Sequence, residues 1–356
     1  MAESRRIPAA ILIAFARDAF TAGGLADADA AIVADAMIEA DLVGADAHGV
    51  FRLSQYVGNL KSGRVNPKAK IKVLQRSPAA ALIDGDNGMG HLVMTRAANL
   101  AVEIAREAGV AWVGARRSNH AGAAGVYASI PLAHNMVGIY AAVSSANHMA
   151  PWGGAEPLMG TNPIAVAIPA GKEAPVVLDI ATSVASFGTI RTHAISGTPL
   201  PEGWVADRTT GRPITDAKKV SEGVLLPIGG YKGSGLALMI GLLAGVLNGA
   251  AFGREVIDFT APGTEECNTG QFMIAVDVAR FQQPKIFAAE MDRHLQELRT
   301  SARLPGVDVI RYPGEERRRR KADRGKNGLS LTAQLIQQLD DLSAGLKIKP
   351  LSMRLS

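Results

Sequence analysis

Two basic side chains four residues apart, His48 and Arg52, are of the types that acid–base chemistry on a carboxylate requires. A histidine titrates near neutral pH and can give or take a proton there. An arginine one helical turn further on can hold a carboxylate through two parallel hydrogen bonds. We expect this segment to be helical, which would direct both side chains to one site. The plainer interpretation is a surface histidine near a helix start and an arginine in a salt bridge.

A second candidate acid/base is His120, which closes an expected strand in the sequence Ser118-Asn119-His120. A helix is expected to begin at Gly122, and the positive end of a helix lowers the pKa of a nearby histidine and keeps it neutral, as suits a base. The alternative is a capping or buried structural histidine. Both histidines remain candidates, with His48 preferred.

Two further stretches have the composition of a nucleotide-binding site. Asp179 to Ser183 provides a carboxylate, two hydroxyls and backbone N–H groups directly after an apolar strand, where α/β proteins bind nucleotides. Gly229 to Gly235 is a glycine-rich turn before a helix, and its Lys232 adds a positive charge suited to an anion. A turn that merely caps the helix explains the second stretch equally well. The chain contains neither G-x-G-x-x-G after a strand nor a Walker pattern.

Composition limits the classes of protein and of site. The chain has 356 residues, 47% of them hydrophobic and 38 of them glycine, which is enough for a large α/β core in two or three lobes. Cys267 is the single cysteine, so no internal disulfide or cysteine zinc cluster can form. No H-E-x-x-H motif or carboxylate cluster at ligand spacing occurs, and we expect no metal.

The net charge of +5 is concentrated in Arg317–Lys326, where seven basic residues accompany one acidic residue. A solvated basic face is the plain interpretation, and a phosphate-facing patch is the alternative. Nucleic-acid binding through this run is a hypothesis of a different class, but the run lacks interleaved aromatics and any reading motif. We therefore expect no nucleic-acid partner.

The N-terminal segment has two interpretations, a targeting sequence or a helix of the folded body. Arg5-Arg6 precede the apolar run 7–16, which superficially resembles a signal peptide. However, Ile7, Ile11 and Phe15 recur every four residues, which is typical of an amphipathic helix on a globular body. No apolar run approaches the roughly 20 residues that cross a bilayer. We expect a cytoplasmic protein without a membrane partner.

Strands and helices alternate along the chain, which predicts the α/β class. The expected helices are 8–22, 26–42, one before Asn66-Pro67, 95–108, 122–134, 233–247 and 286–303. The expected strands are 70–75, 79–86, 109–116, 136–145, 164–168, 176–180 and 271–281, with an irregular region over 192–220. We divide the chain into a helical N-terminal region with the proposed acid/base (1–70), an α/β cofactor- and substrate-binding core (71–285) and a helical C-terminal region with the basic run (286–356).

Eight motifs occur in an order that resembles one known family. They are DAHGVFRLSQY (46–56), SNHAGAAGVYA, GTNPIAVAIPA, VLDIATSVASFGTI, LPEGW, GGYKGSGLALMI, FMIAVDVARF and YPGEE. Together they are similar to the type 2 malate/L-lactate dehydrogenase family, over about Ile7 to Leu342. The resemblance implies a mixed sheet of the sulfolactate dehydrogenase kind that binds nicotinamide without a Rossmann fold. It also implies helical segments at both ends.

The family resemblance assigns roles to particular residues. It implies His48 as proton donor and His120 as proton acceptor in different members. Arg52 is the candidate for the substrate carboxylate from its own chemistry. Ala47 stands where the family has serine, which removes one expected substrate hydrogen bond. The cofactor, NAD or NADP, is implied to contact Ser144, Ile180, Ala181, Thr182, Ser183, Lys232, Gly314, Glu315 and Glu316.

The resemblance also implies an activity and an assembly. The implied reaction is hydride transfer between a nicotinamide and a 2-hydroxy or 2-oxo acid such as malate or lactate. Reduction of a cyclic imine carboxylate, piperideine- or pyrroline-2-carboxylate, is the alternative. A homodimer is the implied assembly. One or two of Arg317 to Arg320 are candidates for the 2′-phosphate of NADP, because arginine matches phosphate by bidentate hydrogen bonding.

Overall fold

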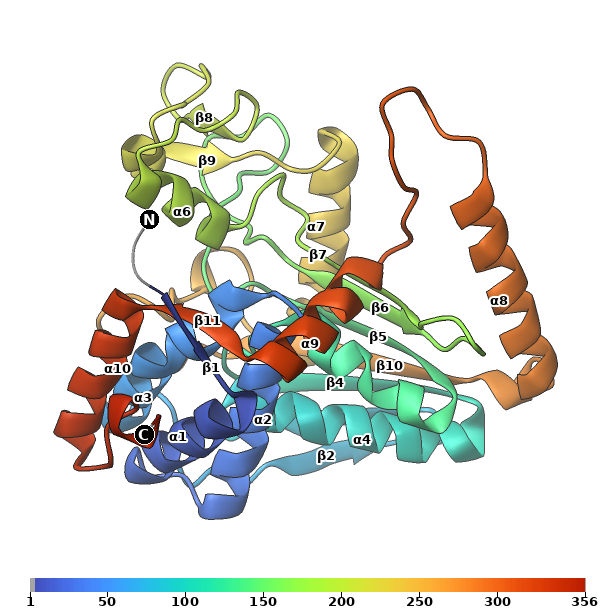
Figure 1. Ribbon diagram of the computed structural model, residues 1–356, viewed down its shortest axis with the longest axis horizontal. Coiled ribbons are helices and arrows are strands. Elements are labelled where there is room, and N and C mark those ends of the chain that lie inside the picture. Colours follow the sequence, from blue (N-terminus) through green and yellow to red (C-terminus); the bar gives the residue numbers. More distant parts are fainter. Residues whose placement is uncertain (1–3, 356) are drawn as a thin grey trace.

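A seven-stranded mixed sheet lies at the centre of the computed structural model, which describes residues 4–355 apart from the side chains of 187, 191 and 195 (Figure 1). Its strand order is β2-β3-β4-β10-β5-β6-β7, in which β3 and β4 are parallel and all other neighbours are antiparallel. The strands are β2 (Lys72–Arg76), β3 (Ala80–Asp84), β4 (Val110–Ser118), β5 (Met136–Ala142), β6 (Ile164–Ile168), β7 (Val176–Ile180) and β10 (Thr269–Asp277).

Helices cover both faces of this sheet. On one face, α4 (Gly90–Ala108) and α5 (Ala124–Ala128) share a core with Met273 and Ala275 of β10. On the other face, α7 (Tyr231–Ala244) packs against β5 and β10, where Phe272 meets Ile240. The alternation of Phe272 and Met273 between the two faces follows from the two-residue period of a strand.

The two ends of the chain share a separate helical core. It joins α1 (Ala9–Ala22), α2 (Asp27–Leu42) and α3 (Leu53–Lys61) to α10 (Ala333–Leu346). A short antiparallel pair, β1 (Ser4–Ile7) with β11 (Leu329–Thr332), fastens the ends together (Figure 1). Four-residue strands are too short to show a period, and the sequence analysis did not predict them.

Several expected elements have different bounds. The expected helix 122–134 is the short α5 followed by a 3₁₀ turn, η3 (Ile130–His134). The expected irregular region 192–220 is wrong in part, because α6 (Phe187–Ser196) extends into it and β8 (Val205–Asp207) pairs within it with β9 (Gly223–Leu225).

The C-terminal helices leave the body of the sheet. α8 (Pro284–Thr300) and the segment after it project from the main body on the right of Figure 1. The chain then returns as α9 (Glu315–Asn327), which carries the basic run across the region between α2 and β7. The α/β class, the mixed sheet and the helical segments at both ends are thus confirmed. The boundaries 1–70, 71–285 and 286–356 stay a prediction.

Candidate active site

Two 3₁₀ turns, rather than one helix, carry His48 and Arg52. They are η1 (Asp46–His48) and η2 (Val50–Arg52), separated by an extended Gly49. The cause is Asp41 at the end of α2, whose carboxylate accepts the Val50 N–H at 2.7 Å. A Cβ on residue 49 would lie 1.8 Å from that carboxylate, so only glycine fits. The expected helical turn is therefore wrong, although the folded segment still brings Arg52 Nε within 3.1 Å of the Ala47 carbonyl oxygen.

His48 is a buried, neutral imidazole. Its Nδ1 is enclosed by protein and has no hydrogen-bond partner among the described residues. Burial lowers the pKa of His48 to about 4. The charge of Asp179 acts in the opposite direction, and the charges of Arg52 and Arg317 assist the lowering. At neutral pH this side chain can therefore accept a proton.

The hydrogen bonds of His120 define its tautomer. The Gly122 N–H donates to His120 Nδ1 at 3.3 Å, so Nδ1 carries no proton, and the Tyr56 hydroxyl at 2.6 Å must also donate to it. The remaining proton then lies on Nε2. Burial is the largest cause that lowers the pKa of His120 well below its ordinary value, and a positive charge on His48, Arg52 or His91 acts in the same direction. The expected helix dipole contributes little, because α5 begins two residues beyond Gly122 and is only five residues long.

Aromatic rings join these groups into one cluster. The His48 and His120 rings stack with centroids 5.4 Å apart, and Phe259 stacks on His120 at 4.3 Å. The Arg52 guanidinium lies 5.4 Å from the centroid of the same Phe259 ring. Neither Tyr56 nor Phe259 was predicted as a site residue from the sequence. Tyr56 stands in the motif at positions 46–56, and its spacing of four residues from Arg52 was the available signal.

Asp179 is the penultimate residue of β7, its charge acts on His48, and two further elements bind it. Its Oδ2 accepts the Gly125 N–H at 3.0 Å and Arg317 Nη1 at 3.1 Å, while Arg317 Nη2 donates to its main-chain oxygen at 3.1 Å. Arg317 thus has a partner inside the chain. The sequence provided no signal for this pair, whose members are 138 positions apart.

Three of the expected cofactor segments lie together. The Ser144 hydroxyl is 3.4 Å from the Thr161 hydroxyl, and the Thr182 N–H donates to the Thr161 carbonyl. The Ile228 N–H in turn donates to the Thr182 carbonyl, which places 180–183 beside the turn that leads into α7. Lys232 is exposed in the first turn of α7 and has no ion-pair partner among the described residues.

Only some polar groups of these segments are free to contact a nucleotide. The Thr182 hydroxyl donates to the Thr161 carbonyl at 2.9 Å, and the Ser183 hydroxyl donates to the Ala185 carbonyl at 2.7 Å. Thr182 is fully buried and Ser183 is 4% exposed, so these two hydroxyls fix the backbone of the segment. Lys232 is exposed and therefore available to a phosphate. The residues present therefore fit a nicotinamide dinucleotide.

The expected segment 314–316 lies at the opposite end of β7. Gly314 has φ of 101° and its Cβ position is 2.8 Å from the Val177 nitrogen, so the close approach of α9 to β7 requires glycine. Glu315 binds Arg299, and Glu316 binds Arg319 and Arg320. Both carboxylates therefore already have partners within the chain.

The basic run is largely paired. Arg317 binds Asp179, Arg319 and Arg320 bind Glu316, Lys321 binds Glu39, and Arg324 binds Asp46. Of the four candidates for a 2′-phosphate, Arg318 alone has no ion pair among residues 4–355. A contact between this run and NADP stays a prediction.

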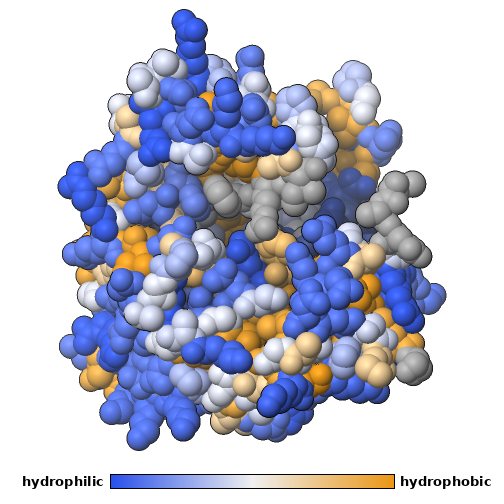
Figure 2. Space-filling model, turned by 90° about the vertical axis from the view of Figure 1, so that its left-hand side faces the viewer, coloured by the Kyte–Doolittle hydropathy of each residue, from blue (hydrophilic) through white to orange (hydrophobic). Residues whose placement is uncertain are grey.

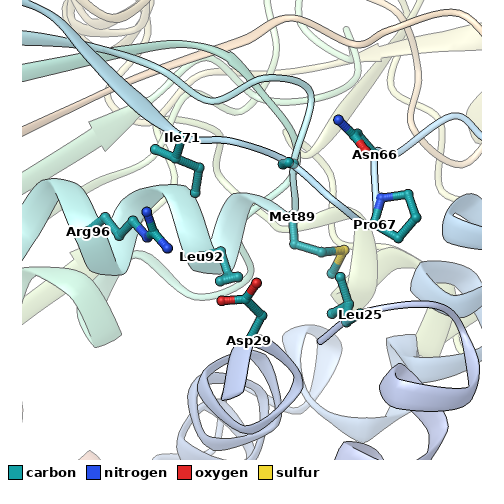
Figure 3. A pocket seen from close by; sticks show the side chains of 10 residues that line it. Leu25, Asp29, Asn66, Pro67, Ile71, Met89, Leu92 and Arg96 are labelled. Carbon is teal, nitrogen blue, oxygen red and sulfur yellow. The ribbon is translucent and has the colours of Figure 1, made fainter. Parts of the chain in front are cut away.

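The described residues also bear on a metal site and on a small pocket apart from the expected site residues. No group of three or more histidine, cysteine, aspartate or glutamate side chains in residues 4–355 is arranged to hold a metal ion. Figure 3 shows a pocket between α2 and α4, lined by Asp29, Met89 and Arg96, among others. Its volume of about 10 Å³ accommodates no more than a water molecule, and none of the expected site residues lines it.

One helical stretch in the described part, Tyr231–Asn248, is long and apolar enough to cross a membrane by length and composition. A core helix of a soluble protein passes the same test. In this stretch Ala237, Ile240 and Ala244 are buried, and the helix packs on β5 and β10. Its position on the sheet accounts for those apolar residues.

Comparison with known proteins agrees with this geometry. The family model described as malate/L-lactate dehydrogenase matches residues 7–340. The chain belongs to the malate/L-lactate dehydrogenase family. A malate dehydrogenase of Pyrococcus horikoshii is 36% identical over 346 residues, which cover 95% of this chain and 94% of the relative. An L-sulfolactate dehydrogenase of Methanocaldococcus jannaschii is 39% identical over 319 residues, which cover 90% and 91%.

A solved structure of this family has the same fold. The sulfolactate dehydrogenase structure from Methanocaldococcus jannaschii matches with a TM-score of 0.90 and 36% identity, covering 97% of this chain and 98% of that chain. The expectation of a sulfolactate dehydrogenase-like fold is confirmed, and this family member is an oxidoreductase of the dehydrogenase class.

Proposed function

We propose that this dehydrogenase transfers a hydride between NAD or NADP and a small 2-hydroxy or 2-oxo acid. The observation that supports this most strongly is the cluster of two neutral imidazoles with a guanidinium, His48, His120 and Arg52, joined through Phe259. A 2-hydroxy acid presents one carboxylate to hold and one hydroxyl proton to move. The cluster contains one group for the first task and two for the second.

The roles follow from these environments. Arg52 binds the substrate carboxylate with its planar fork. His48, which burial keeps neutral, takes the hydroxyl proton as the substrate carbon is oxidised, and returns it in the reverse reaction. His120 presents its Nε2–H to the oxygen and polarises it, with Tyr56 holding the ring. When bound, the nicotinamide supplies the hydride acceptor or donor. Ser144, the 180–183 segment and Lys232 are the residues that would hold it.

A panel assay tests this proposal. The purified protein is mixed with malate-, lactate- and sulfolactate-type 2-oxo acids and with NADH or NADPH, and the reduced nicotinamide absorbance is followed. Reduction of at least one 2-oxo acid is expected. A relative in Pseudomonas putida, 34% identical, is named Δ¹-pyrroline-2-carboxylate/Δ¹-piperideine-2-carboxylate reductase, so cyclic imines belong in the panel. Turnover of imines alone would replace the hydroxy-acid proposal, and no turnover at all would contradict both.

We also propose a homodimer, supported by exposed apolar side chains along α7 and its extension. Exposed apolar side chains follow the outer side of α7 and its extension; they are Tyr231, Leu236, Leu238, Met239, Leu243, Val246 and Leu247. Leu304, beyond α8, is 77% exposed. Patches of this kind mark protein interfaces. In contrast, the face shown in Figure 2 is largely hydrophilic.

The assembly is measurable in solution. Sedimentation of the wild-type chain should give the mass of a dimer, and Leu247→Asp should shift it toward a monomer. Val73→Asp, at an apolar residue of the edge strand β2 that is also exposed, is the matched control and should remain dimeric. A monomeric wild type at micromolar concentration would contradict the proposal.

For its location and other partners, we propose a cytoplasmic enzyme that binds neither nucleic acid nor membrane. The buried thiol of Cys267, without a disulfide, supports a reducing compartment. The internal ion pairs of α9 leave few charges of the basic run for phosphates. A gel-shift titration across salt concentrations should show no retained complex, and a salt-dependent shift would contradict this proposal.

A further inference from the structure

The basic helix α9 connects the two parts of the candidate active site. At its C-terminal end, Arg324 binds the carboxylate of Asp46 and the main-chain oxygen of Asp41, next to the turns that carry His48. At its N-terminal end, Arg317 binds Asp179 at the end of β7. A helix that contacts both sides of a site can determine how the sides are placed relative to each other.

Arg317 holds Asp179 with well-formed hydrogen bonds. One guanidinium nitrogen binds the carboxylate and the other binds the carbonyl of the same residue, both at 3.1 Å. The side chain of Asp179 is 11% exposed and that of Arg317 is 31% exposed, so water screens the pair only in part. On the other side of the carboxylate, the position of a Cβ on Gly125 would be 2.9 Å from Oδ2. The carboxylate is therefore held between α5 and α9.

We infer that Arg317 is a positioning residue of the active site, which orients the Asp179 carboxylate and offsets its negative charge beside His48. The inference rests on the proposed function for the role of His48 as acid/base. It assigns the first arginine of the basic run to substrate chemistry by way of Asp179. It thereby replaces the expectation that this arginine contacts a 2′-phosphate.

The charged groups around His48 determine the expected effect. Asp179 from β7 favours the imidazolium, whereas Arg317 from α9 and Arg52 from η2 disfavour it. His120 and His91 also face His48, and both are neutral because burial lowers the pKa of each. Removal of Arg317 leaves Asp179 uncompensated, and the pKa of His48 should rise from about 4.

The test compares three variants of the full chain. Arg317→Gln removes the charge, and Arg317→Lys keeps the charge but cannot hold both oxygens in the same plane. Lys326→Gln, in the last turn of α9, removes one exposed positive charge that has no ion pair among the described residues, and it is the matched control. The Lys variant also provides the measurement if the Gln variant does not fold.

The first readout needs neither cofactor nor substrate. Histidine side-chain NMR of the protein alone, with the His48 signal assigned by its loss in His48→Gln, gives the titration of that ring. We expect an upward shift of about one pH unit in Arg317→Gln, a smaller upward shift in Arg317→Lys and no change in Lys326→Gln. An unchanged His48 titration in Arg317→Gln, or in Arg317→Lys if only that variant folds, would overturn the inference. An equal shift in the control would overturn it as well.

The second readout separates this inference from the proposed function. In oxidation of the hydroxy acid, the acidic limb of the kcat/KM profile should move to higher pH in Arg317→Gln, with kcat falling and the KM for cofactor nearly unchanged. If the wild type oxidises no hydroxy acid, the proposed function fails, and the NMR titration still decides whether Arg317 acts on His48. If the wild type is active and both profiles coincide, the inference fails alone.

Discussion

Replacement of the buried Asp41 by asparagine should change how the stability of the fold depends on pH. Asp41 is 4% exposed, and burial raises the pKa of its carboxyl from 3.8 to about 7, with the nearby Asp46 adding to the rise. The folded chain therefore binds this proton more tightly than the unfolded chain does. The contribution to stability is complete below about pH 4 and is lost as the pH rises through about 7.

The size of the effect follows from the two pKa values. Each unit of difference corresponds to about 1.4 kcal/mol, so ionisation of Asp41 costs the fold at most about 4 kcal/mol. Between pH 5 and pH 8 the wild type should lose about 2–3 kcal/mol relative to Asp41→Asn. The asparagine is uncharged throughout, and its Oδ1 can still accept the Val50 N–H that shapes the turns around Gly49.

Urea unfolding of both proteins at pH 5 and pH 8 measures this difference. All other groups titrate in both proteins, so the gap between their unfolding free energies isolates Asp41. Asp35→Asn makes the same chemical change on the exposed side of α2, where no bonded partner is present among the described residues. That control should follow the wild type at both pH values. A gap between Asp41→Asn and wild type that is equal at pH 5 and pH 8 would refute the reasoning.

Three predictions concern catalysis. His48→Ala should lower kcat by roughly 10²–10⁴-fold, while the affinity for NADH measured by fluorescence titration is retained. If kcat falls in His120→Ala and not in His48→Ala, the roles of the two histidines must be exchanged. Arg52→Lys keeps the charge but loses the planar fork, so kcat/KM for the acid should fall, and an unchanged value would remove Arg52 from the site. Tyr56→Phe removes the hydroxyl that holds the His120 ring, a bond of about 0.5–1.5 kcal/mol, and should lower kcat/KM roughly 2- to 10-fold. An effect of Tyr56→Phe on thermal stability alone would contradict the last prediction.

Local patterns in the sequence predicted much of this protein. The four-residue recurrence of apolar side chains predicted α1, and the apolar runs predicted β6 and β7 within a residue of their observed bounds. The ordered motifs predicted the family and its fold, which the comparisons confirm. These features are accessible because strand and helix periods, turn residues and contiguous motifs depend on neighbours a few positions apart.

Tertiary structure decided the chemistry around the predicted residues. Spacing alone indicated a helix through His48 and Arg52, but the buried carboxylate of Asp41 takes the Val50 N–H and breaks the segment at Gly49. The two histidines are neutral mainly because the fold buries them, which no sequence pattern reports.

The basic run shows the same division. Its sequence indicated a solvated face or a phosphate site. Most of the run is exposed, and the structure adds a pair that the sequence did not indicate, Arg317 with Asp179 across 138 positions. Pairs that are far apart in the chain depend on which elements pack together and on how much water they exclude, and these two conditions exist only in the folded molecule.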